Sequence, residues 1–139
     1  MANLIFALLA LYIALVGAMY LFQRKLMYLP DTVIAAPAQY GLEGFSEHFI
    51  AAADSVRLQL WHRPARAGFP TILYFHGNAG HIGNRAGIYA ALADKGFGVI
   101  ALSYRGYGKS EGAPSEAGLY ADARAGIAFA QTFLSGFQR

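Results

Sequence analysis

A run of 19 residues without a charged side chain, Leu4 to Phe22, constrains the fold of this chain more than any other feature. As an α-helix it would be roughly 28 Å long, close to the ~30 Å hydrocarbon core of a bilayer. A cleaved signal peptide usually has a basic start and a shorter apolar run, so an uncleaved membrane anchor over residues 1–25 is favoured, with a cleaved signal as the alternative. Arg24 and Lys25 follow the run and no Lys or Arg precedes it, which predicts a single-pass protein with its C-terminal part in the cytoplasm.

The composition excludes several kinds of site. The chain has 139 residues, enough for one ordinary domain, and it has no cysteine. Disulfides, thiolate chemistry and a cysteine-based zinc site are therefore excluded. The net charge of +3 comes from 11 basic and 8 acidic residues that are scattered along the chain, which is typical of a solvated surface. We expect no metal, no cofactor and no nucleic-acid partner.

Residues 26–44 are interrupted by prolines and glycines but keep several apolar side chains, so they predict an irregular connector that lies against a domain at residues 45–139. Two short strands follow, Glu47–Ala52 and Val56–Arg63, which a turn at Asp54–Ser55 would join into an antiparallel hairpin. In the second strand two sets of side chains alternate between faces: Val56, Leu58 and Leu60 on one, and Arg57, Gln59 and Trp61 on the other.

Two continuous apolar segments, Thr71–Phe75 and Gly98–Tyr104, predict buried strands, the first with both of its faces covered. A helical pattern separates them. The strand–helix–strand order predicts a parallel pair with a right-handed crossover, and hence an α/β fold. Because the sequence stops at Arg139, where a further strand would begin, the sheet is expected to be incomplete.

Two helices are predicted in this part of the chain. Asn84 would cap the first, which runs to about Lys95 and ends at Gly96, with Ile88 and Leu92 on one face. The second would begin at residues 114–116 and run to about residue 134. Its apolar residues recur at helical spacing: Leu119, Ala123, Ile127, Ala130 and Leu134.

The glycine-rich stretch Arg105–Gly112, RGYGKSEG, contains fragments of two catalytic motifs. A phosphate-binding loop needs a glycine where this chain has Ser103, and a helix that starts directly at Ser110. A nucleophile elbow, G-x-S-x-G, needs its serine immediately between a strand and a helix, but here the strand ends well before Ser110 and Pro114 delays the helix. Neither motif fits, so Ser110 is predicted to be a turn residue.

A second glycine-rich stretch, His76-Gly77-Asn78-Ala79-Gly80, directly follows the strand predicted at residues 71–75. Glycines let the backbone turn with positive φ and approach a ligand closely. A main-chain N–H held in such a turn is the group that an acyl-transfer enzyme needs to bind the oxyanion of a tetrahedral intermediate. On these five residues alone, an ordinary glycine-rich turn between a strand and a helix is the alternative.

The two stretches, in this order and separated by a helix and the strand GVIALSY, resemble the α/β-hydrolase superfamily, specifically its N-terminally membrane-anchored serine hydrolases. The resemblance extends from the anchor through Phe133. It implies an α/β fold in which a transmembrane helix precedes the first strands and two helices of a hydrolase sheet. It also implies that the backbone N–H of Asn78 is an oxyanion-hole donor. The implied supporting residues are His76, Gly77, Ala79 and Gly80 in the oxyanion loop, and Arg105, Gly106 and Gly108 in a turn beside it.

The serine, acid and histidine of that family come after the next strand, so the resemblance implies that the catalytic triad is absent from these 139 residues. The histidines offer no replacement, because His48 and His62 belong to the hairpin, His76 to the turn, and His81 is expected to pack in a loop. We therefore expect the N-terminal portion of a membrane-anchored hydrolase of an ester, thioester or amide, inactive by itself.

The missing strand would leave residues 71–75 at an exposed edge of the sheet, which predicts a strand-pairing partner or aggregation there. For the same reason we expect residues 26–139, expressed alone, to be poorly soluble. A membrane-tethered, non-catalytic binding protein built on half of a hydrolase sheet is the alternative function.

Overall fold

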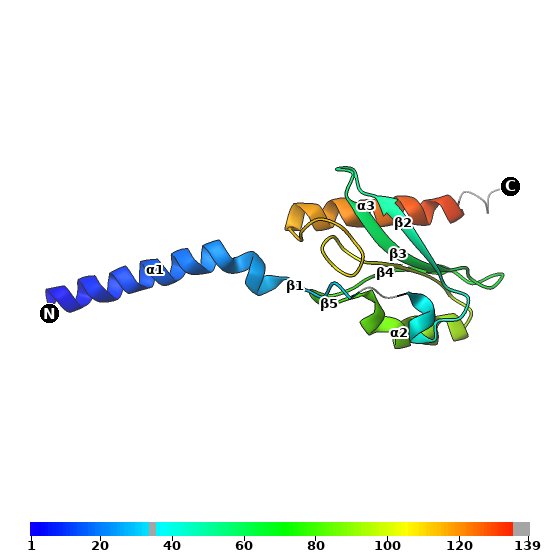
Figure 1. Cartoon of the computed structure of the whole chain (residues 1–139), viewed down its shortest axis with the longest axis horizontal. Coiled ribbons are helices and arrows are strands. Elements are labelled where there is room, and N and C mark those ends of the chain that lie inside the picture. Colours follow the sequence, from blue (N-terminus) through cyan, green and yellow to red (C-terminus); the bar gives the residue numbers. More distant parts are fainter. Residues whose placement is uncertain (34–35, 135–139) are drawn as a thin grey trace.

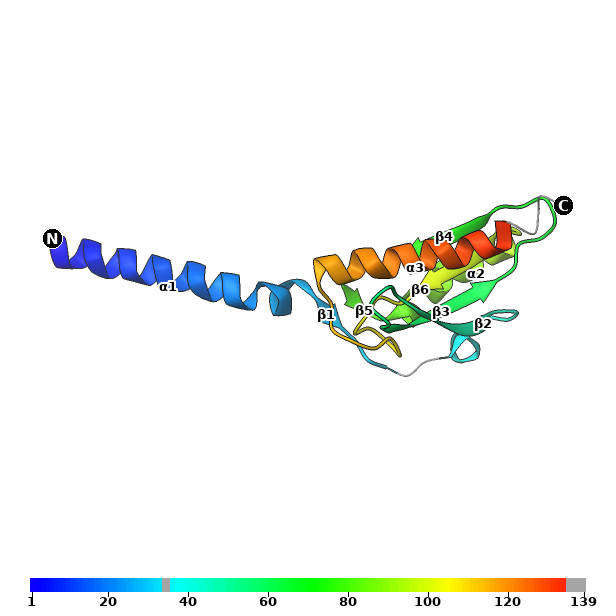
Figure 2. The same ribbon diagram turned by 90° about the horizontal axis from the view of Figure 1, so that it is seen from above.

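A computed structural model describes residues 1–33 and 36–134 of the chain. Residues 34–35, part of the predicted connector, and residues 135–139, the end of the predicted domain, lie outside the described residues. Helix α1 (Ala2–Met27) projects away from the rest of the molecule and meets it at a single junction (Figures 1 and 2). Of the described helices, α1 alone is long and apolar enough to cross a membrane, and none of its residues is buried by the described chain.

A four-stranded sheet with the order β2-β3-β6-β4 forms the centre of the domain. The strands are β2 (Ser46–Ala51), β3 (Arg57–Arg63), β4 (Thr71–Phe75) and β6 (Gly98–Leu102). β2 and β3 form the predicted antiparallel hairpin, and β4 and β6 form the predicted parallel pair. The turn of the hairpin has Ser55 at φ +65°. Together these strands confirm the α/β fold.

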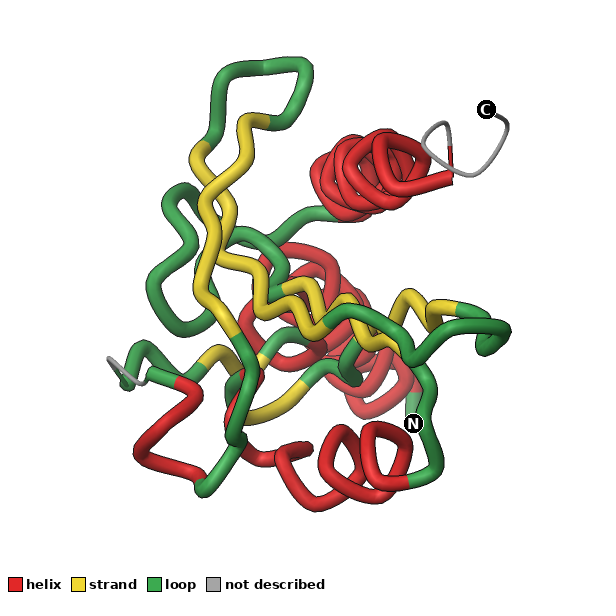
Figure 3. Tube along the Cα trace, turned by 90° about the vertical axis from the view of Figure 1, so that its right-hand side faces the viewer, coloured by secondary structure: helices red, strands yellow, loops and turns green. Residues whose placement is uncertain are grey.

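Helices α2 (Ala86–Asp94) and α3 (Glu116–Leu134) cover opposite faces of this sheet (Figures 1 and 3). β3 contributes to both cores: Leu58 and Leu60 pack on the α3 side, and Trp61 packs on the α2 side. Gln59 is also fully buried. Successive side chains of β3 therefore point into two different cores, because a helix covers each face of the sheet.

The prediction for α2 is right about the stop and wrong about the start. Gly96 follows the helix with φ +99°, as a C-terminal glycine should. Asn84 does not cap α2, because a 3₁₀ turn, Ile82–Arg85, precedes it and the Asn84 Oδ1 accepts the His81 N–H at 2.6 Å. Ile88 is 44% exposed. The buried residues of the helix are Ala86, Tyr89 and Ala93.

The predicted apolar face of α3 is right in part, because Ala130 packs on the core as expected. Ile127 is 46% exposed, whereas Asp122 is completely buried. The residues that pack on the core are Ala121, Ala125, Phe129 and Ala130. The face of α3 turns inward around Asp122 because this carboxylate pairs with Arg105 beneath the helix.

β4 lies at the edge of the sheet and pairs only with β6 within the described residues. Both of its faces are covered in part, as predicted, because Tyr74 packs on the α2 side and Leu73 and Phe75 pack on the α3 side. Its inner residues are half-buried, since no further described strand lies beside it. The edge position itself was expected.

The connector lies against the domain, as predicted, and it does so through two short strands that the sequence did not indicate. β1 (Leu29–Pro30) pairs in parallel with β5 (Ala79–Gly80), at the junction between α1 and the domain (Figure 1). A 3₁₀ turn, Pro37–Tyr40, then leads to β2. The connector is therefore bonded to the glycine-rich stretch that follows β4.

Candidate functional site

The two glycine-rich stretches meet at one edge of the sheet. β4 and β6 are parallel neighbours, so their carboxyl ends lie side by side and the loops that follow them are adjacent. The Tyr107 Oη of the second loop donates to the Asn78 carbonyl of the first at 2.9 Å. This edge is where ligands bind in open α/β sheets.

His76 braces the turn in a neutral form. Its Nε2 accepts the backbone N–H of Tyr104 at 3.1 Å, so the proton is on Nδ1, which donates to the Gly77 carbonyl at 2.6 Å. Burial lowers the pKa of His76, the hydrogen bond to the Gly77 carbonyl partly opposes this, and the nearby Arg85 and His81 lower the pKa further. With both ring nitrogens engaged, His76 is placed to shape the turn.

Asn78 has three hydrogen bonds that hold it and one donor that is open. Its carbonyl accepts from the Leu29 N–H as well as from Tyr107, and its Nδ2 donates to the Met27 carbonyl at 2.8 Å. Within residues 1–33 and 36–134, its backbone N–H makes no hydrogen bond. Asn78 is exposed, so this N–H is open to a ligand.

The direction of that N–H follows from peptide geometry. The Gly77 carbonyl and the Asn78 N–H belong to one planar trans peptide and point in opposite directions. Because the His76 ring holds the carbonyl, the N–H points away from the ring. Gly80, which closes the loop, has φ +82°, and a Cβ there would collide with the Asn84 side chain, so this position requires glycine.

The second loop is held by a buried ionic cluster. The Arg105 guanidinium donates to Asp122 at 2.7 and 2.9 Å and to Asp54, in the hairpin turn, at 2.7 and 3.0 Å. Hydrogen bonds to Asp54 and Asp122 raise the pKa of Arg105. The sequence analysis did not identify Asp122 as the partner of Arg105. The one indication was that a carboxylate stands among the alanines of a predicted helix. Arg105 thus ties the loop to β2–β3 and α3 and does not contact the loop after β4.

The glycines of the second loop allow its backbone to turn with positive φ. Gly106 and Gly108 have φ +79° and +55°. The Gly106 N–H donates to the Glu111 carbonyl, and the Gly108 N–H donates to the Asp31 carbonyl at 2.8 Å. Gly108 therefore contacts the connector beside the candidate site.

Ser110 and Lys109 are occupied by structural contacts. The buried Ser110 hydroxyl donates to the Ser103 carbonyl at 2.7 Å and accepts the Gln59 N–H at 2.9 Å. Lys109 Nζ lies 2.8 and 2.9 Å from the two oxygens of Glu47. Ser110 is a turn residue, as predicted, and the lysine of the apparent phosphate motif is paired with a carboxylate.

The other histidines do not complete a catalytic arrangement. The buried His81 accepts the Gly83 N–H through Nδ1 and lies 3.3 Å from the Tyr40 hydroxyl, which is the predicted packing role. Ser46 and His48 are hydrogen-bonded at 2.8 Å, but β3 and β6 separate β2 from β4, a distance of roughly 14 Å at 4.8 Å per strand. Among the described residues, no group of His, Asp or Glu could hold a metal ion.

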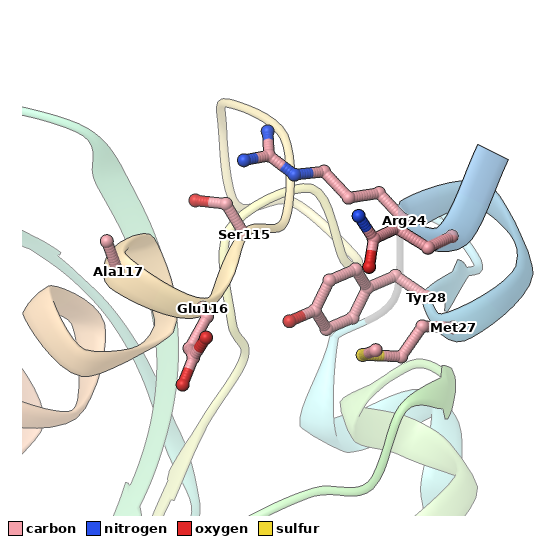
Figure 4. A pocket seen from close by; sticks show the side chains of 7 residues that line it. Arg24, Met27, Tyr28, Ser115, Glu116 and Ala117 are labelled. Atoms are coloured by element: carbon pink, nitrogen blue, oxygen red, sulfur yellow. The ribbon is translucent and has the colours of Figure 1, made fainter. Parts of the chain in front are cut away.

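A cavity of about 640 Å³ lies between the end of α1 and the start of α3 (Figure 4). Arg24 and Tyr28 face Ser115 and Glu116 across it. The remaining residues that line it are Gln23, Met27 and Ala117. The cavity therefore separates the end of α1 from the start of α3.

The matches with known proteins agree with the fold. A family model described as alpha/beta hydrolase fold matches residues 70–134. An uncharacterized protein of Mycobacterium tuberculosis is 40% identical over 116 residues, which are 82% of this chain and 40% of that protein. The lysophosphatidylserine lipase ABHD12 of Danio rerio is 32% identical over 108 residues, 63% of this chain and 28% of the lipase.

Among solved structures, the esterase Pf2001 of Pyrococcus furiosus matches with a TM-score of 0.60 and 23% identity, over 74% of this chain and 40% of the esterase. At this identity the likeness shows the fold alone. The sheet, its two helical layers and these matches define the α/β-hydrolase fold. The chain belongs to the α/β-hydrolase superfamily, and it spans about 40% of the length of the Mycobacterium tuberculosis relative.

Proposed function

We propose that this chain supplies the membrane anchor and one oxyanion-hole donor, the backbone N–H of Asn78, to a serine hydrolase that acts on an ester, thioester or amide. One observation carries the proposal: this N–H is unbonded within the described residues while the peptides on both sides of it are held in place. A donor that is fixed before the substrate arrives stabilises an oxyanion without reorganising.

Two further findings support the acyl-transfer chemistry. The loop lies at the carboxyl end of a parallel strand, where the second donor of a hydrolase oxyanion hole, the N–H after the nucleophile, can approach it. The family membership and the lipase among the relatives agree with hydrolysis of an acyl group. His76, Gly77, Ala79 and Gly80 would support the donor.

A chimera tests the role of Asn78. The 139 residues are joined to the part of the Mycobacterium tuberculosis relative that follows the matched region, and hydrolysis of p-nitrophenyl esters is measured. Asn78→Pro removes the backbone N–H, so kcat should fall by about 10²–10³. Asn78→Ala keeps the N–H and should cost much less. A folded chimera whose Asn78→Pro variant keeps the parent rate would refute the proposal.

We further propose that the 139 residues by themselves do not hydrolyse acyl substrates. A Ser–His–carboxylate triad is not formed by the described residues, and Ser110 is buried in backbone hydrogen bonds. A fluorophosphonate probe should leave the full chain unlabelled while it labels the chimera. Labelling of the chain itself would contradict this statement.

The exposed edge of β4 favours the alternative function, a membrane-tethered binding protein that accepts a partner strand. The discriminating measurement is the fate of β4 in the full chain. A strand-pairing partner should protect the β4 amides from hydrogen exchange in the absence of any chimera. Aggregation of the purified chain, relieved by adding the C-terminal part of the relative, supports the hydrolase instead.

We propose that the protein is a single-pass membrane protein with its domain in the cytoplasm, as Arg24 and Lys25 at the end of α1 suggest. Because the chain has no cysteine, a single Ala53→Cys substitution in the exposed hairpin turn provides a clean probe. In intact cells a membrane-impermeant maleimide should not react with it, and it should react after the membrane is permeabilised.

A further inference from the structure

The exit of the membrane helix is bonded directly to the candidate oxyanion loop. We call residues 27–31 the exit segment. Its Met27 carbonyl accepts the Asn78 Nδ2 at 2.8 Å, its Leu29 N–H donates to the Asn78 carbonyl at 2.9 Å, and its Asp31 N–H donates to the Gly80 carbonyl at 2.9 Å. The pairing of β1 with β5 therefore joins the end of the anchor to the loop after β4.

These bonds fix the peptide on the far side of Asn78. The His76 ring holds the peptide that precedes Asn78, and the Leu29 N–H and the Tyr107 hydroxyl hold the carbonyl that follows it. With both flanking peptide planes held, φ and ψ of Asn78 are determined, and so is the direction of its N–H. The Leu29 N–H of the exit segment is therefore one of the two donors that fix the peptide after Asn78.

Asp31 extends the connection to the second loop. Its N–H bonds to Gly80 and its carbonyl accepts the Gly108 N–H at 2.8 Å, so one residue of the exit segment joins both glycine-rich loops. Its carboxylate lies 4.0 Å from the buried His81 ring. The exit segment therefore helps to fix the position of the two loops relative to each other.

The other side of the exit is not braced in this way. The last turn of α1 and the first turn of α3 are separated by the cavity of about 640 Å³ between Arg24 and Glu116 (Figure 4). Among the described residues, the hydrogen bonds that join residues 24–31 to the domain go to Asn78 and Gly80 in the first loop and to Tyr107 and Gly108 in the second. A force on the anchor is therefore transmitted to the two glycine-rich loops.

We infer that the exit segment is a positioning element of the oxyanion loop, so that the membrane anchor holds the Asn78 N–H in its working direction. The catalytic meaning of this inference rests on the proposed function, whereas its structural content does not. It predicts that removal of the Leu29 N–H loosens Asn78 and leaves the rest of the domain unchanged.

The asparagines of the chain make the test selective. They stand only at positions 3, 78 and 84, so selective ¹⁵N-asparagine labelling of the full chain in detergent micelles gives three backbone signals. Asn3 reports the anchor, Asn84 the 3₁₀ turn before α2, and Asn78 the loop. No catalytic activity enters the measurement.

The matched variants are Leu29→Pro, which removes the N–H, and Leu29→Ala, which keeps it. Tyr28 is already extended, with φ −102° and ψ 122°, as a residue before proline must be. In the parent chain the Asn78 order parameter should be near 0.85, like that of Asn84, and in Leu29→Pro it should fall below about 0.6 with a shifted signal. Leu29→Ala should leave all three signals in place.

The outcomes separate the inference from the proposed function. An Asn78 signal that is mobile in the parent chain, or unchanged in Leu29→Pro, overturns the inference even if the chimera is active. A rigid Asn78 that Leu29→Pro releases supports it even if the chimera is inactive. If Leu29→Pro also displaces the Asn84 signal, the change is not confined to the loop and the inference is overturned.

In the chimera the same pair of variants gives a catalytic readout. Leu29→Pro should lower kcat roughly tenfold with little change in KM, because a misdirected donor weakens transition-state binding and not substrate binding. Leu29→Ala should keep the parent kcat. An equal loss in both variants would show a general packing effect and overturn the positioning role.

Discussion

Two glycine-rich loops leave neighbouring strands at the same edge of the sheet, and they differ in what their polar groups do. In the loop after β6, the polar groups of Arg105, Lys109 and Ser110 are all bonded to other parts of the domain. In the loop after β4, the backbone is held on both sides of Asn78 while one N–H is unbonded within the described residues.

The difference shows how a structural loop and a site can be distinguished. The loop after β6 contains the letters of two catalytic motifs, yet its hydroxyl and its cations are buried or paired, so they are not available to a substrate. In the loop after β4, the polar group that is unbonded among the described residues is a main-chain N–H, that of Asn78. Availability of the polar group, more than its chemical type, separates the two loops.

The largest effect is expected from breaking the ionic cluster of the second loop. Asp122→Ala would leave the Arg105 guanidinium buried with the half-exposed Asp54 as its remaining carboxylate partner among the described residues, and breaking a buried pair in this way costs about 3–5 kcal/mol. The free energy of unfolding can be followed by urea titration in detergent through the single tryptophan, Trp61, which lies in the core.

Asp54→Asn is the matched control for this prediction. Asp54 bonds to the same guanidinium from the exposed hairpin turn, where water can replace it. The urea midpoint of Asp54→Asn should therefore move much less than that of Asp122→Ala. Equal shifts of the urea midpoint in the two variants would mean that the cluster acts as a surface ion pair. The buried Asp122–Arg105 pair would then not be what holds the second loop in place.

A smaller loss of stability is expected from Ser110→Ala. The hydroxyl joins β3 to the end of β6 through the Gln59 N–H and the Ser103 carbonyl, and its removal leaves both groups buried without that partner. We expect a loss of about 1–3 kcal/mol in the free energy of unfolding. In the chimera, fluorophosphonate labelling should persist. Loss of labelling in a folded Ser110→Ala chimera would make this serine a reactive residue.

The sequence was sufficient for the parts of the fold that depend on local pattern. Continuous apolar segments located β4 and β6, and the Asp54–Ser55 turn located the hairpin. The inward face of α3 was predicted only in part, because a charged residue, Asp122, occupies it, and its partner Arg105 lies 17 positions away. Periodicity counts apolar residues, so it cannot find a face that an ion pair turns inward.

The site was predictable only as a motif. His76-Gly77-Asn78 located the loop, but the groups that hold it are distant in the chain: Met27 and Leu29 from the connector, and Tyr107 from the next loop. Strands of two residues, such as β1 and β5, have no periodicity to detect. Their pairing depends on the tertiary fold, and the sequence alone therefore missed it.

The two loops should also respond to pH through His76, which joins them by bonding Gly77 and the Tyr104 N–H. Burial lowers its pKa from the ordinary value of 6.5, so the unfolded chain binds a proton that the folded chain resists. Stability is then fully present above pH 6.5 and is lost as the pH falls below it, by at most about 1.4 kcal/mol per pH unit.

Urea titrations at pH 7, 6 and 5 would measure this slope, and His76→Phe should flatten it. Burial lowers the pKa of His62 as well, with a contribution from His48, so part of the slope should remain in the variant. An unchanged slope in His76→Phe would mean that the ring is not the neutral brace between the loops that its hydrogen bonds indicate.

The smallest effect concerns Lys109, the residue that makes the second loop look like a nucleotide site. Its side chain is about a fifth exposed, and its ammonium group pairs with Glu47. Burial raises the pKa of Glu47, while hydrogen bonds from Lys109 and Gln59 lower it more. A pair so close to solvent stabilises by at most about 1 kcal/mol.

Lys109→Met should therefore lower the free energy of unfolding by no more than that amount, because Gln59 still donates to Glu47 at 2.7 Å. Titration with magnesium and ATP should give no binding heat in either the parent chain or the variant. Binding in the parent that Lys109→Met abolishes would place a phosphate in the loop after β6, and the contrast between an available donor in one loop and satisfied groups in the other would no longer hold.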